Sequence, residues 1–423
     1  MKAKVYPLKE MTNEVNVVAS SFCLHLQIIC ASLAKGKSII KNIVNSKDID
    51  TTIEWCSSLG AIIKKEEDRI IVKGVDNKIN LKNSLFYCKT STTAKLMIPL
   101  LCSVPQPFGV NTNDDVLKEL KEFSFVYDKY GINYYEEDEL IRFEKVMKTC
   151  EVEFDGDLDI YMSAGILIAL PLLSGNSTFK LRAPKRSERT YNTITKILKA
   201  FSVDIKHPAT MRYEINGNQK YKATMITSEM DCMLLSYQAL LAKLLKPEQT
   251  IELKGFKRNT TMDEERLFDE VKKVATDYKN YLVNKFYKFK EYEFHKLDAS
   301  VENSLPLLMV LSSLNNQDTL ISKVDFNKER VRKQYGIMAK AYAKLSLSIS
   351  DFENQIVVNP GVAKVKKQVD SCNDPYVVMA LSYLALFSDV PIVIKNVKCV
   401  YNLYADFFND LKGIGVKVEF IYD

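Results

Sequence analysis

A short β-rich segment recurs along the chain at an even spacing, and this repetition constrains the fold more than any other feature. The copies are GKSIIKN from Gly36, GNSTFKL from Gly175, EQTIELK from Glu248, QDTLISK from Gln317 and DVPIVIK from Asp389. Neighbouring copies start roughly 70 residues apart, except that the first two are about twice as far apart, which predicts a repeated supersecondary unit. A weakened copy is therefore expected near residue 106, within VPQPFGVNT.

An apolar stretch of helical length precedes each of these strands. The six stretches are Ser21–Lys35, Ser91–Val104, Asp159–Ser174, Asp231–Lys246, Val301–Asn316 and Asp374–Phe387. Each is apolar on most faces, as in CMLLSYQALLAKLL, and a helix that is apolar all round is typical of a domain interior. We therefore expect six buried helices.

An amphipathic helix and a hairpin follow most of the strands. The best copy is DIDTTIEWCSSLG followed by AIIKKEEDRIIVKG, and two weaker copies are NTITKILKAF with VDIK and YADFFNDLKGIG with VKVEFIYD. Apolar positions in the first segment follow a helical period, whereas IIKKEEDRIIV reads as two strands joined by a polar turn. The repeated unit is thus a buried helix, a strand, an amphipathic helix and two further strands.

Six units divide naturally into two domains of three. The chain has 423 residues, which is more than one hydrophobic core usually serves. No Pro/Gly/Ser-rich linker separates the halves. We therefore expect the chain to cross twice, near residues 20 and 229, so that residues 1–19 and 230–423 form one domain and residues 20–229 the other.

Composition narrows the class of protein. The net charge is +6 with a pI near 8.6, which suits anionic small substrates and falls short of a nucleic-acid footprint. The nine cysteines form no CxxC pair and the three histidines have no metal-ligand spacing, so we expect reduced thiols and no metal site. The first residues have no apolar signal region, and the apolar stretches are too short to span a membrane. We expect a cytoplasmic protein without nucleic-acid or membrane partners.

The repeats also resemble a known family over nearly the whole chain. LHLQIICASLAKGKSIIKNIVNSKDIDTTIEWCSSLGAII and DGDLDIYMSAGILIALPLLSGNSTFKL are similar to the first and third units of the enolpyruvyl transferases, and VENSLPLLMVLSSL, NKERVR, CNDPYVVMALSYLAL and CVYNLYADFFNDL to the last two. The shikimate-pathway branch is the better match, because the cysteine-bearing loop of the nucleotide-sugar branch has no counterpart at residues 105–113. The resemblance implies a two-domain inside-out α/β barrel, each domain being three βαβαββ units around buried parallel helices.

The resemblance also implies an activity. Members of this branch transfer the carboxyvinyl group of phosphoenolpyruvate to a hydroxyl of shikimate 3-phosphate, a step toward the aromatic amino acids, and they use no cofactor. Two anionic substrates require Lys and Arg as charge-assisted donors, and the chemistry requires an acid and a base. Small anionic substrates and a monomer are therefore the expectation.

Candidate site residues in the first half follow from the positions of the family motifs. Phosphoenolpyruvate would contact Lys95, which takes the place of an arginine, and Lys118. The acceptor would contact residues at helix starts and after the third strand, namely Ser21, Ser91, Thr92, Tyr161 and Ser187. Plain helix capping by the Ser/Thr segment is an equally good interpretation of residues 90–93. His25, alone on an apolar helix, is typical of a packed residue.

The second half supplies the candidate catalytic residues. The Lys-Glu-x-x-Arg pattern is kept as Lys328, Glu329 and Arg332. The resemblance makes Glu329 the proton-transfer carboxylate beside Lys328, and Arg332 an anchor for phosphoenolpyruvate. Asn303 stands where the family has a catalytic aspartate, and the neighbouring Glu302 would take that role if the register slips by one residue. A charged, solvated helix surface is the alternative interpretation of this segment.

Several charged residues of the family are replaced here. Ser21, Leu26, Tyr376 and Asn402 occupy cationic positions, and Asp159 occupies the position of a serine that faces the acceptor phosphate. Each lost charge-assisted contact costs roughly 1.5–3 kcal/mol of affinity. Three hypotheses therefore stay open: a divergent active enzyme, an enzyme with a different acceptor, and an inactive pseudoenzyme.

Overall fold

The chain divides into two compact units, which we describe separately. One consists of Met1–Val18 and Met230–Asp423, and the other of Ala19–Glu229. The computed structural model describes residues 1–12, 14–137, 140–144, 146–184, 188–244, 251–254, 267–268, 285–287, 296–301 and 303–422.

The 19–229 unit contains three four-stranded sheets with one shared strand pattern. In each, the first two strands are parallel and the next two follow antiparallel. The sheets, in strand order, are β14 (Met225–Thr227), β3 (Lys37–Lys41), β5 (Arg69–Lys73) and β4 (Ile62–Lys65); β6 (Leu85–Tyr87), β7 (Phe108–Asn111), β9 (Leu140–Phe143) and β8 (Tyr134–Glu137); and β10 (Glu151–Asp155), β11 (Ser177–Arg182), β13 (Arg212–Ile215) and β12 (Ile205–Ala209).

The other unit repeats this pattern in its described residues. Two of its sheets have four strands and one has three. They are β21 (Gln368–Asp370), β22 (Ile392–Lys395), β1 (Lys2–Val5) and β23 (Val418–Ile421); β17 (Lys296–Asp298), β18 (Thr319–Ser322), β20 (Gln355–Val358) and β19 (Ile349–Phe352); and β16 (Lys285–Tyr287), β15 (Ile251–Lys254) and β2 (Glu14–Asn16).

Two strands close the sheets of their own units near the points where the chain passes from one unit to the other. β2 precedes the 19–229 unit in sequence but pairs in parallel with β15 of its own unit. β14, near the end of the 19–229 unit, likewise pairs in parallel with β3 near its start. Each unit therefore closes its sheets with strands that are distant in sequence.

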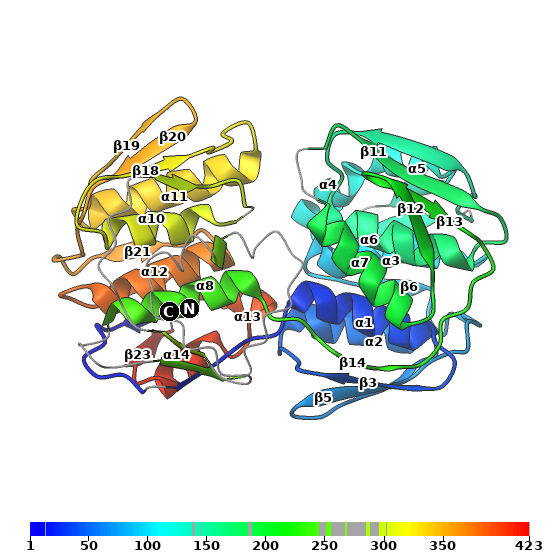
Figure 1. Ribbon diagram of the computed structural model, residues 1–423, viewed down its shortest axis with the longest axis horizontal. Coiled ribbons are helices and arrows are strands. Elements are labelled where there is room, and N and C mark those ends of the chain that lie inside the picture. Colours follow the sequence, from blue (N-terminus) through cyan, green and yellow to red (C-terminus); the bar gives the residue numbers. More distant parts are fainter. Residues whose placement is uncertain are drawn as a thin grey trace. The chain divides into compact units, whose positions relative to one another are not determined.

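Three helices fill the interior of each unit, as Figure 1 shows. In the 19–229 unit these are α1 (Ser21–Leu33), α3 (Ser91–Leu101) and α6 (Ile160–Ala169), and in the other unit α8 (Cys232–Leu240), α10 (Leu305–Ser313) and α12 (Pro375–Phe387). Every residue of α1, α8 and α10 is buried, as all-round apolarity predicts. The expected buried helices are confirmed.

Polar residues begin four of these buried helices. The side chains of Ser20, Asp159, Asp231 and Asp374 accept hydrogen bonds from backbone N–H groups in the first turn that follows them. By contrast, the side chains of Thr90 before α3 and Ser304 before α10 make no such bond. A short polar residue ahead of each apolar stretch thus sets where most of these helices start.

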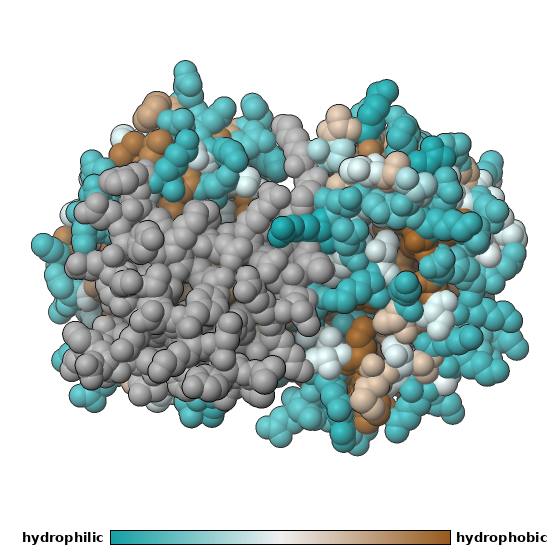
Figure 2. All heavy atoms as spheres, in the orientation of Figure 1, coloured by the Kyte–Doolittle hydropathy of each residue, from teal (hydrophilic) through white to brown (hydrophobic). Residues whose placement is uncertain are grey.

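Other helices lie between the buried helices and solvent. They include α2 (Lys47–Ser58), α4 (Asp114–Lys121), α5 (Ser124–Lys129) and α7 (Arg189–Ala200) in the 19–229 unit, and α11 (Glu329–Lys344), α13 (Val400–Leu403) and α14 (Phe407–Gly413) in the other. The described surface of the 19–229 unit is mostly hydrophilic on the face drawn in Figure 2. Within the described residues, no helix has the length and apolarity needed to cross a bilayer.

The repeated unit predicted from the sequence is confirmed. β3, β11, β15, β18 and β22 lie at the five expected positions, and β7 at the weakened sixth. The amphipathic segments form α2, α7 and α14. Helices packed inside and small sheets outside make this the predicted α/β architecture.

Candidate active site

Lys95, which takes the place of an arginine of the family motif, is a buried cation. It lies on α3 with only 6% of its surface exposed. Its Nζ donates to Oε1 of Glu119 on α4 at 2.5 Å and to Oδ2 of Asp159 before α6 at 3.1 Å. The same ammonium lies over the ring of Phe123, 5.3 Å from its centroid.

The two carboxylates decide the charge state of Lys95. Burial acts to lower its pKa, but Asp159 and Glu119 more than offset this and raise the pKa above its usual value. Lys95 is therefore a protonated ammonium whose charge is balanced within the protein. A lysine paired in this way presents little net positive charge to an anionic ligand.

The start of α3 is held by a second polar cluster. The hydroxyl of Thr90 donates to Oδ1 of Asp48 on α2 at 2.8 Å rather than capping α3. Burial raises the pKa of Asp48 to about 6, while hydrogen bonds from Thr90 and Thr92 oppose that shift. Capping by the Thr90 side chain is therefore not observed, and the N–H groups of the first α3 turn lie beside Ser91 and Thr92.

His25 is linked through two threonines to the same polar cluster at the start of α3. Its Nδ1 lies 2.7 Å from Oγ1 of Thr52, which in turn lies 2.7 Å from Oγ1 of Thr93. Burial lowers the pKa of His25 to about 3, so the imidazole is neutral near pH 7. His25 is a packed residue joining α1 to α2.

The acceptor-binding candidates are partly brought together. Ser21 is the buried first residue of α1, and the ring of its neighbour Phe22 meets the ring of Tyr161 edge-on at 5.3 Å. Lys118 is exposed on α4, and its neighbour Glu119 makes the contact with Lys95 instead. Ser187 lies outside the described residues, as does Glu302.

In the other unit, a buried amide connects two family motifs. Nε2 of Gln334 on α11 donates to Oδ1 of Asn303 at 3.3 Å and to Oδ2 of Asp374 at 3.1 Å. Asn303 has a φ of +62°, a left-handed conformation that asparagine tolerates. Tyr376 follows Asp374 on α12, and the Arg330 guanidinium lies 5.6 Å from the centroid of its ring.

The Lys-Glu-x-x-Arg motif lies at the start of α11. Lys328 is the residue before the helix and Glu329 its first residue, and both are exposed. Arg332 is also exposed, and its Nη1 donates to the carbonyl oxygens of Phe326 at 2.7 Å and Asn327 at 3.0 Å. Arg332 thus folds back onto the loop before its own helix.

Three polar residues of these clusters were not predicted from the sequence. They are Asp48, Glu119 and Gln334. Glu119 directly follows the predicted Lys118, and choosing between them required knowing which face of α4 meets α3. Asp48 and Gln334 lie in charged helical segments where no sequence pattern separates a buried polar residue from a solvated one. Among the described residues, no group of three or more His, Cys, Asp or Glu side chains could hold a metal ion.

Comparison with protein families matches residues 5–411 to EPSP synthase (3-phosphoshikimate 1-carboxyvinyltransferase). The chain belongs to the EPSP synthase family. A relative named 3-phosphoshikimate 1-carboxyvinyltransferase from Clostridium botulinum (strain Alaska E43 / Type E3) is 26% identical, with 97% of each chain covered. One of the same name from Clostridioides difficile (strain 630) is 25% identical, with 98% of each covered.

Solved structures share the fold. EPSP synthase from Acinetobacter baumannii superposes with a TM-score of 0.80 at 15% identity, covering 99% of this chain and 100% of that one. The enolpyruvyl transferase NikO from Streptomyces tendae gives 0.79 at 13% identity, covering 99% and 98%. The family resemblance stated from the repeats is confirmed by the family match over residues 5–411, and the shared fold covers 99% of the chain.

Proposed function

We propose that this chain is an enolpyruvyl transferase that moves the carboxyvinyl group of phosphoenolpyruvate to an acceptor hydroxyl, with shikimate 3-phosphate as the first acceptor to test. The observation that carries this proposal is the family match over residues 5–411. In this proposal the protein acts in the cytoplasm as a monomer on small anionic substrates.

Glu329 is the proposed proton-transfer group, since it is an exposed carboxylate at the start of α11. Its role would be to exchange a proton with the reacting carbon or hydroxyl oxygen as the acceptor adds and phosphate leaves. Asn303 would hold the substrate by hydrogen bonds, because an amide has no proton to exchange at neutral pH. Lys328, Arg332 and Lys118 are exposed cations available to phosphate and carboxylate groups.

A second candidate function has its own support in the Lys95 cluster. Asp159 stands at a position where the family resemblance implies a serine against the acceptor phosphate, and its carboxylate is bound to Lys95. An anionic phosphate next to Asp159 would be repelled. An acceptor that carries a hydroxyl or amine there, in place of phosphate, suits this group better.

The test is release of phosphate by the purified protein. Phosphoenolpyruvate is supplied at high concentration with shikimate 3-phosphate or with unphosphorylated shikimate. The proposal expects phosphate release that requires both substrates, with the carboxyvinyl ether as the second product. Faster turnover of shikimate than of its phosphate would favour the second candidate. Glu329→Gln should reduce kcat by about 10²-fold or more, the usual contribution of a proton-transfer group.

Glu353→Gln is the matched control, because Glu353 is an exposed carboxylate of the same unit outside every family motif. It should leave kcat unchanged. Binding of phosphoenolpyruvate is measured separately by isothermal titration. If neither acceptor supports phosphate release and phosphoenolpyruvate does not bind, the transferase proposal fails and the inactive pseudoenzyme is the remaining hypothesis.

A further inference from the structure

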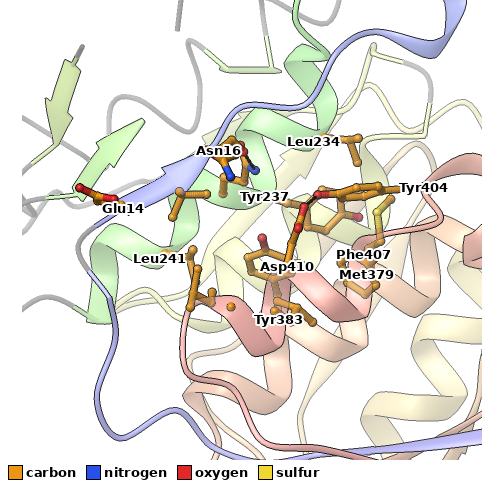
Figure 3. Close-up of a pocket in the computed structure, with 15 residues that line it drawn as sticks. Glu14, Asn16, Leu234, Tyr237, Leu241, Met379, Tyr383, Tyr404, Phe407 and Asp410 are labelled. Carbon is orange, nitrogen blue, oxygen red and sulfur yellow. Dashed lines mark hydrogen bonds between the residues drawn. The ribbon is translucent and has the colours of Figure 1, made fainter. Parts of the chain in front are cut away.

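The unit made of residues 1–18 and 230–423 contains an open cavity of about 150 Å³. Its walls come from β2, α8, α12, α13–α14 and the segments next to them, and Figure 3 shows the side chains converging on it. None of the lining residues is among the proposed transferase residues. What binds here is therefore a question separate from the proposed function.

Aromatic rings form much of the wall. Tyr237, Tyr383, Tyr404 and Phe407 line the cavity, and all four are at least nine-tenths buried. The ring centroids of Tyr237 and Tyr383 are 5.4 Å apart, and those of Tyr404 and Phe407 are 6.0 Å apart. Aromatic faces attract cations through their negative π surfaces, and groups of them bind organic ammonium ions.

A carboxylate lines the same cavity as these aromatic rings. Asp410, on α14, lines the cavity and keeps part of its surface exposed. Its Oδ2 accepts a hydrogen bond from the hydroxyl of Tyr404, drawn as a dashed line in Figure 3. No Lys or Arg in the described part of the chain forms an ion pair with it. Partial burial raises the pKa of Asp410 to about 6, so it is ionised at pH 7.5 but gains from a nearby cation.

A second hydrogen-bond acceptor in the cavity wall, Oε1 of Gln238, has no donor among the described residues. Nε2 of Gln238 donates to the carbonyl oxygen of Asn16 at 2.7 Å, which fixes the orientation of the amide. Its Oε1 is buried and has no hydrogen-bond partner among the described residues, and Gln238 is 5% exposed. An unpaired buried acceptor is costly, and a ligand N–H group would satisfy it once a small shift of the amide turns Oε1 to the cavity.

The charged residues that line the cavity are acidic, which disfavours the binding of anions. The fifteen lining residues, all of them described, include the acids Glu14 and Asp410 and no Lys, Arg or His. Glu14 lies at the edge of the group in Figure 3 and is ion-paired with Lys254. Phosphoenolpyruvate and other phosphorylated anions would meet two carboxylates and no cationic side chain in this lining.

We propose that this cavity is a binding site for a small organic ammonium ion with an apolar body. The ammonium group donates to Asp410 and to Oε1 of Gln238, and the apolar body packs against Tyr237, Tyr383 and Phe407. An apolar cavity of about 150 Å³ accommodates a single benzene ring, which sets the size of the ligand.

The test uses three probes of equal size and different charge on the full chain at pH 7.5. These are benzylammonium, benzyl alcohol and benzoate, titrated by isothermal calorimetry or ligand-observed NMR. We expect benzylammonium to bind at least ten-fold more tightly than benzyl alcohol, and benzoate not to bind. Equal affinity for benzylammonium and benzyl alcohol would overturn the proposal, as would tighter binding of benzoate.

Two variants locate the site. Asp410→Asn keeps the shape of the side chain and removes its charge, so it should weaken benzylammonium at least ten-fold and leave benzyl alcohol unchanged. Asp389→Asn removes the charge of an exposed carboxylate in the same unit that does not line the cavity, and it should change neither affinity. Circular dichroism establishes that both variants are folded. An equal loss in the two variants, or no loss with Asp410→Asn, would contradict this location.

Discussion

Lys95 illustrates how two carboxylates close in space can change the role of a residue in a family motif. The sequence places a lysine where the family resemblance implies an anion-binding arginine. In the structure its ammonium is bound by Glu119 and Asp159. The chemistry of this position therefore depends on residues that are distant in sequence from Lys95 itself.

Replacing Asp159 by serine should restore anion binding near Lys95. Asp159→Ser removes the carboxylate but keeps an oxygen that can cap α6, because serine is among the best N-cap residues. We expect inorganic phosphate and phosphoenolpyruvate to bind at least ten-fold more tightly, measured by isothermal titration. Adding Glu119→Gln should increase the gain.

Asp157→Ser is the control for this substitution. Asp157 is an exposed carboxylate two residues earlier and is absent from the contacts of Lys95. If it raises phosphate affinity as much as Asp159→Ser, the gain reflects overall charge and not release of Lys95.

His25 should make the protein less stable in mild acid. Its folded-state pKa of about 3 lies below the usual 6.5, so the unfolded chain binds a proton that the folded chain does not. Between pH 7 and pH 5 this linkage removes about 2 kcal/mol of stability. Asp48 acts in the opposite sense, because its raised pKa of about 6 favours the folded state as pH falls toward 4.

The His25→Gln variant separates the two effects. The variant keeps the Asp48 contribution and lacks the histidine one, so the change in its urea midpoint from pH 7 to pH 5 should be more positive than that of the natural chain. Parallel pH profiles for the two proteins would rule out the role given to His25.

At the level of single residues, the sequence predicted a part of the candidate site. It placed Ser21, Ser91, Thr92 and Tyr161 at helix starts of one unit, and the structure has them there. The sequence could not predict that Asp48 accepts a hydrogen bond from Thr90, because that contact depends on how α2 packs on α3. The roles assigned to the site residues stay predictions.

Packing between helices depends on one glycine in particular. Gly165 lies in the middle of α6, and a Cβ there would lie 2.5 Å from the carbonyl oxygen of Leu96 and 2.8 Å from that of Lys95 on α3. Backbone atoms cannot move aside as a flexible side chain can. The absence of a side chain at Gly165 thus allows α3 and α6 to approach closely.

We expect Gly165→Ala to destabilise the protein by about 1–3 kcal/mol, the usual cost of overpacking a core. Gly336→Ala is the matched control, because Gly336 lies in α11 and a Cβ there would meet nothing within 4 Å. That change should stabilise by about 0.5–1 kcal/mol through helix propensity. Chemical denaturation of both variants gives the comparison, and a stabilised Gly165→Ala variant would show that the helices can separate without cost.

Secondary structure was predictable because each repeat carries its own pattern. All-round apolarity identified α1, α3 and α6 as interior helices before any contact was known. Short strands followed from the recurring motif, including β7 from its spacing alone. Pairing of β2 with β15 and of β14 with β3 was not predictable from local pattern, because it joins segments more than 180 residues apart.

At the scale of the whole molecule, the division into two units agrees with the pairing of β2 and β14 within their own units. We propose that the units are the two folding domains of the chain. Unit 19–229 completes its sheets with its own last strand, β14. The other unit needs β1 and β2 from one end of the sequence and everything after residue 230 from the other.

The position of β1 has a consequence for synthesis on the ribosome. β1 pairs with β22 on one side and β23 on the other, so residues 2–5 lie between segments 392–395 and 418–421. These residues are translated long before their partner strands. The intervening 19–229 unit can fold before β1 is paired. β1 thus leaves the ribosome before its partner strands and is among the last strands of its unit to be paired, and during that interval its unpaired edges are open to other nascent chains.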